Sequence, residues 1–313
     1  MEELPLPLLI IRGWHSMEWA LHIRSLDQLK DHRYPWRWTE FYDAASEASA
    51  LKPPECFGHI YLGDEFCPHR LPSLQELHRV LEYTQSKSLS LTLITPMVSD
   101  AGLENCRPLL DTLSLHDQTS EIVVNDWGMM TFVQQNYPHF RLALGRLLNK
   151  GFKDPRLQKT ELLADADIFE LFNQSTYRLD VFHRMALSFK INRLERDLLP
   201  YEDIQEQDTQ IPSHHVQNYS YYLPWGYITT GRICLSSNYS SSAASERSFL
   251  PCPDSCDYQC AKFSLQLRNE HFHTHLLQAG NTIFFPYSYE MCRQLISLLQ
   301  TTSHRLVYQG LLV

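Results

Sequence analysis

Five of the eight cysteines in this chain are placed as though they share a metal site. Three of them, in the order P-C-P-D-S-C-D-Y-Q-C, are Cys252, Cys256 and Cys260. Cys234 precedes them in T-T-G-R-I-C, and Cys67 lies far upstream in H-I-Y-L-G-D-E-F-C. Clustered thiols in a chain with intracellular features hold a metal more often than they close a disulfide. The spacing therefore predicts a site of four cysteine ligands, with five candidates for the four places.

The number of ligands does not identify the metal, because zinc and iron–sulfur clusters both accept four thiolates. Structural zinc sites bring short C-x-x-C pairs together, whereas here Cys67 is remote from the other candidates. Such scattered ligands favour an iron–sulfur cluster embedded in an enzyme. Cys252 with Cys256 and Cys256 with Cys260 have the same spacing, so either pair can supply the last two ligands. The remaining cysteines are expected to be small buried hydrophobic residues: Cys56, Cys106 and Cys292.

The elements that must position these thiols alternate between short apolar runs and longer helical patterns. Strands are predicted at 8–14, 58–63, 89–97, 121–125 and 141–145. Helices are predicted at 74–85, 108–115 and 129–137. Strands and helices that alternate in this way indicate βαβ units and a parallel sheet. We therefore expect an α/β fold with a TIM-barrel-like parallel barrel, which the pattern leaves either closed or incomplete.

Polar residues follow the predicted strands, where a barrel of this kind places its active face. They form four pairs: Asp64 and Glu65, Asn125 and Asp126, Arg146 and Asn149, His183 and Arg184. Polar residues also follow strands simply because loops are solvated. Their repetition over several strands favours a lined pocket over that alternative.

The alternation of short apolar runs with helical patterns changes after Leu187. The charged stretch 192–208 is expected to be a helix or an exposed linker. Strands are predicted at 263–267 and 282–286, a helix at 290–302 and a last strand at 305–313. The simplest division is a TIM-barrel-like domain over 1–250 and a cysteine-bearing extension packed on the barrel over 251–313.

Composition and the apolar runs argue against a nucleic-acid-binding, secreted or membrane-spanning protein. The net charge of −9 opposes loose binding to nucleic acid, which depends on excess lysine and arginine. Glu2 and Glu3 stand where a secretory signal carries basic residues. The apolar run 4–11 is too short to span a bilayer, and no later stretch approaches that length. We expect a cytoplasmic protein without a membrane span.

Several of these motifs resemble one known family. The stretch from Tyr61-Leu62-Gly63 to Cys67, the stretch 229–234 and the following C-x-x-x-C are similar to the UbiV-like branch of the collagenase-like peptidase U thirty-two family. The stretch 124–156, with N-D-W-G and L-G-R-L-L-N-K, also resembles a bacterial branch of it. The interval after Cys234 is longer than in UbiV, so the resemblance indicates a paralogue rather than UbiV itself.

The resemblance implies a TIM-like barrel and a four-iron four-sulfur cluster. By motif, its ligands are Cys67, Cys234, Cys252 and Cys256. It further implies dioxygen-independent hydroxylation of ubiquinone precursors or RNA bases with prephenate as oxygen donor, and a UbiU-like family member as partner in a heterodimer. Two alternatives remain: a non-catalytic partner subunit with a structural cluster, and a peptidase-like hydrolase. No G-x-S-x-G motif supports the hydrolase.

Catalytic residues are not assigned by these motifs. An anionic oxygen donor would need arginine forks, for which Arg146, Arg184 and Arg232 are candidates by position. Asp126 and His183 are candidates for proton transfer, although a lone histidine more often has a structural role. A second group alternates in E-H-F-H-T-H, and a solvated hairpin face is favoured over a metal site there: His271, His273 and His275.

Overall fold

Eight parallel strands close into a barrel in the computed structural model, which describes residues 17–30, 57–155, 165–199, 212, 214–232, 234, 236, 264–268, 270, 275–300 and 302–309. Their order around the barrel is β1-β12-β7-β6-β5-β4-β3-β2. The strands are β1 (Glu18–Ile23), β2 (His59–Gly63), β3 (Ser90–Ile94), β4 (Glu121–Val124), β5 (Arg141–Leu144), β6 (Ile191–Arg196), β7 (Asn218–Leu223) and β12 (Arg305–Tyr308). The predicted TIM-barrel-like α/β fold is confirmed, and the barrel is closed.

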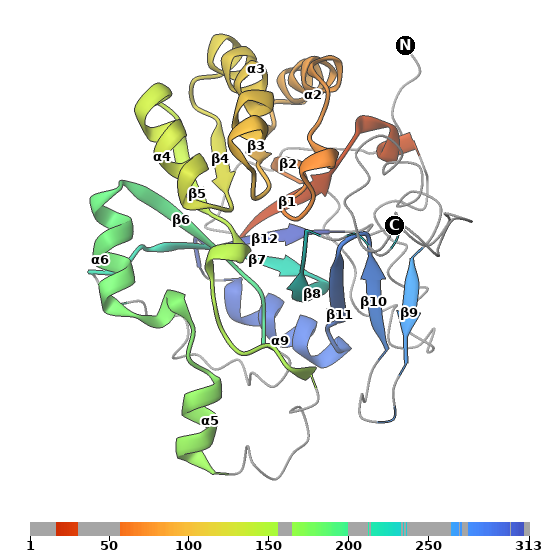
Figure 1. Cartoon of the computed structure of the whole chain (residues 1–313), viewed down its shortest axis with the longest axis vertical. Coiled ribbons are helices and arrows are strands. Elements are labelled where there is room, and N and C mark those ends of the chain that lie inside the picture. The colour runs from red at the N-terminus through yellow and green to blue at the C-terminus, as the bar shows by residue number, and fades with distance from the viewer. Residues whose placement is uncertain are drawn as a thin grey trace.

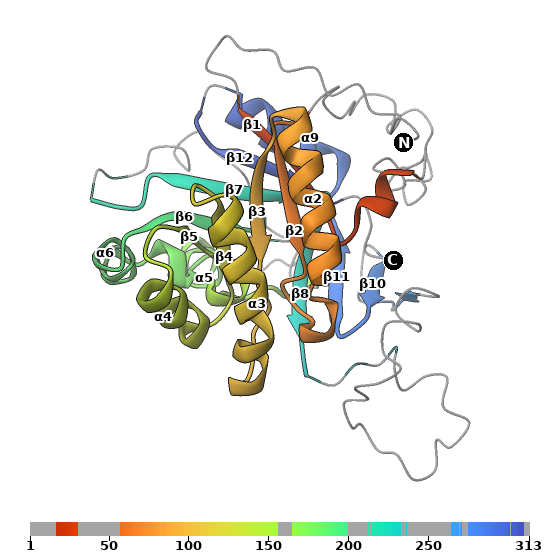
Figure 2. The same cartoon turned by 90° about the horizontal axis from the view of Figure 1, so that it is seen from above.

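Helices surround this barrel on its outer side (Figures 1 and 2). They are α2 (Leu74–Lys87), α3 (Asp100–His116), α4 (Trp127–Asn136), α6 (Asp180–Ser188) and α9 (Tyr289–Leu299). A sixth helix, α5 (Ala166–Phe172), has no buried residue and lies apart from the barrel (Figure 1). Five of these six helices begin at a side chain that accepts a hydrogen bond from a first-turn amide, and these caps are Ser73, Ser99, Asp126, Asp165 and Ser288. Such caps satisfy amide groups that have no partner within the helix.

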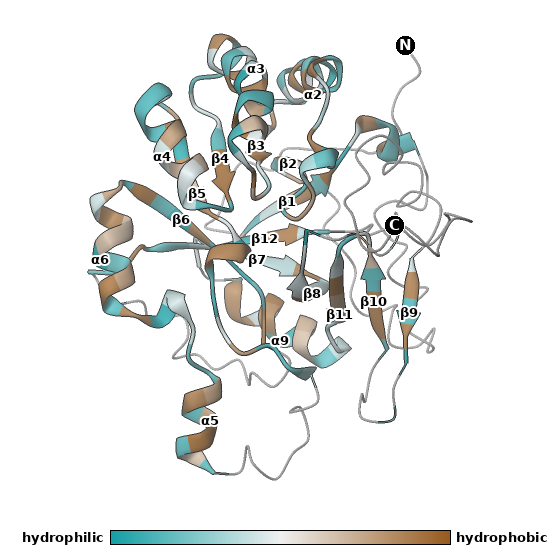
Figure 3. Cartoon of the chain, viewed as in Figure 1, coloured by the Kyte–Doolittle hydropathy of each residue, from teal (hydrophilic) through white to brown (hydrophobic). Residues whose placement is uncertain are grey.

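The apolar core has one large part between strands and helices and a small one inside the barrel. Helices α2, α3 and α4 carry hydrophobic and hydrophilic residues, whereas β3 and β4 are mainly hydrophobic, as Figure 3 shows. The interior cluster contains one residue from most strands: Ala20, Tyr61, Ile94, Val123, Ala143, Tyr222 and Val307. Alternation along a strand sends every second side chain into the barrel, which explains this layer.

A second, antiparallel sheet lies against the carboxyl ends of the barrel strands (Figure 1). Its order is β8 (Trp225–Thr230), β11 (Thr282–Pro286), β10 (Leu276–Ala279) and β9 (Leu265–Leu267). Phe66 and Leu147, which follow β2 and β5, share a buried cluster with Trp225, Tyr227 and Phe284 of this sheet. The sheet therefore covers the face where barrels of this class usually hold their active site.

The chain 251–313 is not confined to the outside of the barrel, since β12 pairs with both β1 and β7. The predicted helix or linker over 192–208 is wrong in its first part, because β6 occupies Ile191–Arg196. His183 and Arg184, predicted to follow a strand, lie within α6. The predicted strand at 8–14 falls outside the described residues.

Candidate functional site

Two of the predicted cysteine ligands border one cavity at the edge of the second sheet. Cys67 lies in the loop after β2, and Cys234 in the segment after β8. Both side chains line a cavity of about 170 Å³. They are nearly buried, with exposed fractions of 8% and 6%. The cavity is completed by Phe66, Pro68, His69, Met97, Ser99, Thr230, Gly231, Arg232 and Asn281.

The loop that carries Cys67 is shaped by the carboxylate of Asp64. Asp64 Oδ1 accepts hydrogen bonds from the backbone amides of Phe66 at 2.9 Å and Cys67 at 3.0 Å. This Asx-type turn is a common way to fix the backbone directly after a strand. Gly63 just before it has φ of +129°, and an added Cβ would lie 2.4 Å from the Ile94 carbonyl oxygen. The chain therefore turns sharply at the end of β2 and brings Cys67 to the cavity.

Asn281 ties the two cysteine-bearing segments together. It lies in the turn between β10 and β11, and its Nδ2 donates to the carbonyl oxygen of Phe66 and to that of Gly231, each at 2.7 Å. One acceptor precedes Cys67 directly, and the other belongs to the segment that leads to Cys234. A single amide thus fixes the relative position of both segments. Sequence reasoning missed Asn281, whose only signal is its place directly after Gly280, a residue type common in turns.

Positive charge surrounds the loop of Cys67. Arg24 contacts Asp64 at 2.8 Å, and Arg70 lies 3.7 Å from the same carboxylate oxygen. Burial raises the pKa of Asp64, but the two guanidinium groups outweigh burial, so its pKa is lowered. Arg24, Asp64, Cys67 and Arg70 also line a second, smaller hollow. The thiolate is the form of cysteine that binds metals.

The cysteines outside this cavity behave differently. Cys106 on α3 and Cys292 on α9 are buried in the apolar core, as predicted. Burial raises the pKa of each thiol to about 12. The other predicted members of the cluster, Cys252, Cys256 and Cys260, lie outside the described residues, as does Cys56. The four-ligand set therefore stays a prediction, of which two members line one cavity.

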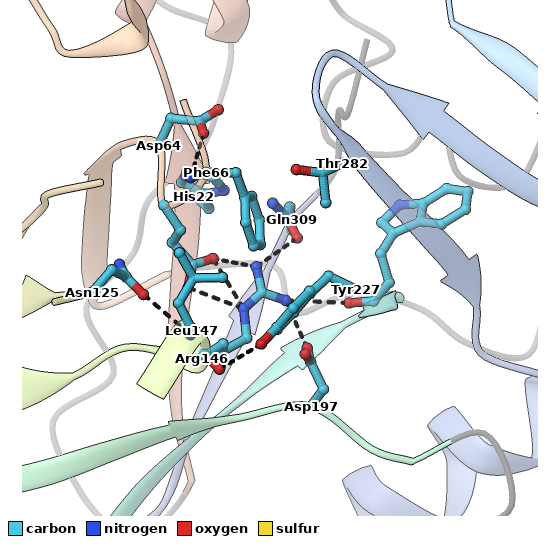
Figure 4. A network of polar contacts seen from close by, with 12 residues as sticks. His22, Asp64, Phe66, Asn125, Arg146, Leu147, Asp197, Tyr227, Thr282 and Gln309 are labelled. Carbon is cyan, nitrogen blue, oxygen red and sulfur yellow. Dashed lines mark hydrogen bonds and ion pairs between the residues drawn. The ribbon is translucent and has the colours of Figure 1, made fainter. Parts of the chain in front are cut away.

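Arg146 is not available as a fork for a substrate carboxylate. Its Nε donates to Glu65 Oε2 at 2.9 Å, its Nη1 to Asp197 Oδ1 at 2.7 Å, and its Nη2 to Glu65 and to Gln309 (Figure 4). The guanidinium lies 3.6 Å from the centre of the Tyr222 ring and is fully buried. Burial lowers its pKa, but Asp197 and Glu65 outweigh burial, so the pKa of Arg146 is raised. Arg146 closes the barrel end instead of binding substrate.

The other predicted polar residues divide between the cavity and structural positions. Arg232 is exposed at the cavity, whereas Arg184 is exposed on α6 and does not line it. Asp126 caps α4 by accepting from the amide of Met129 at 2.7 Å. His183 is buried and bonds to the carbonyl oxygen of Tyr177 at 2.8 Å. Neither Asp126 nor His183 lines the cavity, so the geometry gives them no proton-transfer role there.

The remaining polar side chains predicted at strand ends hold loops. Asn125 donates to the carbonyl oxygen of Thr95 and accepts from the amide of Leu147. Asn149 accepts from the amide of Tyr177. In the histidine run, His275 is exposed just before β10, while His271 and His273 lie outside the described residues. None of the described helices is both long and apolar enough to cross a bilayer.

Comparison with known proteins gives a likeness in structure but no match in sequence. No family model and no curated protein matches the sequence. Among solved structures, that of the U32 peptidase Mk0906 is similar over 97% of this chain and 96% of its own, with 10% identity and a TM-score of 0.43. A likeness of this size does not show a shared activity, and the barrel rests on its own strand pairing.

Proposed function

We propose that this chain is an iron–sulfur protein with a four-iron four-sulfur cluster beside the cavity at the carboxyl end of the barrel. Cys67 and Cys234 would be two of its ligands, and two of Cys252, Cys256 and Cys260 would supply the others. The observation that carries the proposal is the meeting of Cys67 and Cys234 at one cavity, although they come from distant parts of the chain.

The residues present fit such a group. The donors are thiols, which iron–sulfur clusters require, and both are nearly buried. Cys67 also shares a small hollow with Arg24 and Arg70. Asp64 and Asn281 fix the two segments by backbone hydrogen bonds, so a cluster would meet a preformed half-site. When bound, the cluster would pass single electrons or, with one iron open, activate a ligand.

The finer proposal is support for dioxygen-independent hydroxylation or related redox chemistry, as in the UbiV-like branch, with a UbiU-like partner. Arg232 and His69 line the cavity and are the groups that would bind an anionic oxygen donor there. Phe66 and Met97 would keep water from the reacting centre.

A structural cluster in a non-catalytic partner subunit is the second candidate. The covered barrel mouth favours it, because Arg146, Glu65 and Asp197 fill the place where a barrel enzyme would bind its substrate. A reaction would therefore have to use the cavity beside the axis.

Metal analysis of the anaerobically purified protein tests the cluster. We expect about four irons and four acid-labile sulfides per chain, with a broad absorption band near 400 nm, as is usual for such clusters. Cys67→Ala and Cys234→Ala should lose most of the iron. Cys106→Ala is the matched control, since it removes a buried thiol outside the cavity and should keep its iron. Wild-type protein with zinc alone or no metal, or full iron in both cavity variants, would overturn the proposal.

Addition of a small carboxylate separates the redox role from the structural one. Electron paramagnetic resonance of the reduced cluster should change when prephenate is added, and Arg232→Ala should abolish that change. Arg184→Ala provides the control, because Arg184 is an exposed arginine that does not line the cavity. A spectrum indifferent to carboxylate in wild-type protein would favour the structural cluster.

A further inference from the structure

Two histidines and one aspartate meet on the surface, away from the cysteine cavity. Asp180 is the first residue of α6, while His214 and His215 precede β7. His215 Nε2 lies 2.5 Å from Asp180 Oδ1, and His214 Nε2 lies 3.4 Å from the same oxygen. One nitrogen or oxygen atom from each of the three side chains falls within 4.8 Å of the others. None of these residues lines the cysteine cavity.

The distances from the two imidazole nitrogens to Asp180 are close to those expected around a tetrahedral metal ion. With bonds of about 2.0–2.1 Å to zinc, tetrahedral ligand atoms stand about 3.3 Å apart. The His214–Asp180 separation of 3.4 Å already has this value, and the His215–Asp180 pair would need to open by less than an ångström. Three protein ligands leave a fourth position for water, as in zinc sites that exchange ligands.

The segment that carries both histidines is held in place by its own hydrogen bonds. The amide of His215 donates to the carbonyl oxygen of Pro212 at 2.9 Å. Gln217 Nε2 donates to the carbonyl oxygens of Pro212 and His215, each at 2.8 Å. Ordering the ligands before the metal arrives lowers the entropy that binding must overcome.

The His215 ring also has a fixed orientation. It stacks on the His183 ring with 3.8 Å between centroids and 6° between planes. His183 is itself anchored, because its Nδ1 accepts from the amide of Val216 and its Nε2 bonds to the carbonyl oxygen of Tyr177. One face of the His215 ring is therefore covered, while its Nε2 faces Asp180.

We propose that Asp180, His214 and His215 bind a divalent transition-metal ion, with zinc as the best fit. Imidazole nitrogen and carboxylate oxygen are the donor set that zinc shares with nickel, cobalt and ferrous iron. One carboxylate charge and two neutral imidazoles leave a singly positive complex, and the exposed side chains of Asp180 and His214 keep it hydrated. This site does not depend on the cysteine cluster.

Isothermal titration with Zn²⁺ on the anaerobically purified holoprotein tests the site. We expect one binding event whose affinity falls at least about tenfold in Asp180→Asn and in His214→Ala, since loss of a group that merely supports a ligand already costs about 10–100-fold. These two side chains are 60% and 56% exposed, so their replacement should leave the fold intact. Circular dichroism of each variant checks that point.

Two controls separate this site from other zinc ligands. His139→Ala removes an exposed histidine outside the cluster and should bind zinc like the wild type. The Cys67→Ala variant should keep the zinc-binding event even if the variant has lost its iron. Equal zinc affinity in wild type, Asp180→Asn and His214→Ala would overturn the proposal. So would a wild-type event that disappears in Cys67→Ala.

Discussion

Both ends of the barrel pair cationic side chains with carboxylates, but only one of the two ion clusters is open to water. At the carboxyl end, Arg146 and Lys153 face Glu65 and Asp197, and the side chains of all four are at most 7% exposed. The amino end also sets two arginines against two glutamates, namely Arg193 and Arg305 against Glu18 and Glu121. The Glu18 side chain, however, is 37% exposed.

This difference shows where chemistry can take place. Within each set the cations equal the carboxylates, so neither set offers a spare charge to a substrate on the barrel axis. The carboxyl end is in addition covered by the second sheet through Phe66, Trp225 and Tyr227. The open cavity with Cys67 and Cys234 lies beside that sealed end. Because the carboxyl end of the barrel axis is covered, the cavity between barrel and second sheet is the place that remains for a reaction.

Removal of Arg146 should have the largest effect on stability. Arg146→Met would leave Glu65 and Asp197 buried without their main counter-charge, which costs about 3–5 kcal/mol when a buried pair loses one partner. Chemical denaturation monitored by circular dichroism measures the change. Adding Glu65→Gln to the same chain removes one uncompensated charge and should restore part of the loss. No recovery in the double variant would contradict the charge argument.

Neutralisation of Glu195, which lies between the two ends, should stabilise the protein above neutral pH. Its Oε1 accepts from Tyr61 at 3.0 Å, and its Oε2 has no hydrogen-bond partner among the described residues. Burial, reinforced by Glu121, raises the pKa of Glu195 from 4.5 to about 7. Because the folded pKa lies above the unfolded one, the stabilising contribution is present below pH 4.5 and is lost as pH rises through 7.

In Glu195→Gln the side chain is neutral at every pH, so the variant does not lose stability as the pH rises. Between pH 4.5 and pH 8, the free energy of unfolding of the variant should rise by about 3 kcal/mol relative to that of the wild type. Denaturation curves at both pH values measure this change. Burial lowers the pKa of His22 and His304 to about 4, and these groups cancel in the comparison because both proteins contain them. A difference that does not change with pH would show that folding does not raise the pKa of Glu195.

The barrel could be predicted from the sequence where its strands are apolar. The predicted runs at 58–63, 121–125 and 141–145 coincide with β2, β4 and β5 to within a residue. Strand β6 was missed because it contains the charged residues Arg193, Glu195 and Arg196 and is followed directly by Asp197. The ion-pair partners of a charged side chain inside a barrel come from other strands and their loops. Spacing in the sequence does not show which residues pair.

The candidate site was predictable in its thiols and in Arg232, which lines the cavity as a candidate arginine should. Residue type and spacing brought Cys67 and Cys234 together, because few side chains bind metals as thiolates do. Arg146 was assigned to substrate for its position after a strand, yet its partners Glu65 and Asp197 come from other strand ends. The place of Asn281 after Gly280 indicates a turn but not its role, which depends on two carbonyl oxygens that only the fold brings near.

Removal of Arg305 should cost less than removal of Arg146, and this contrast tests the two ends directly. Arg305 donates to Glu121 at 2.5 Å and to Glu18 at 2.7 Å. In Arg305→Met, Arg193 would still lie 3.3 Å from Glu121, and water would reach Glu18. We expect a loss of about 2 kcal/mol, the scale of a hydrogen bond to a charged group. Added salt should change this loss more than that of Arg146→Met, because exposed charges are screened more than buried ones. Equal losses and equal salt effects would mean that exposure of Glu18 does not distinguish the two ends, and that both act as sealed ion clusters.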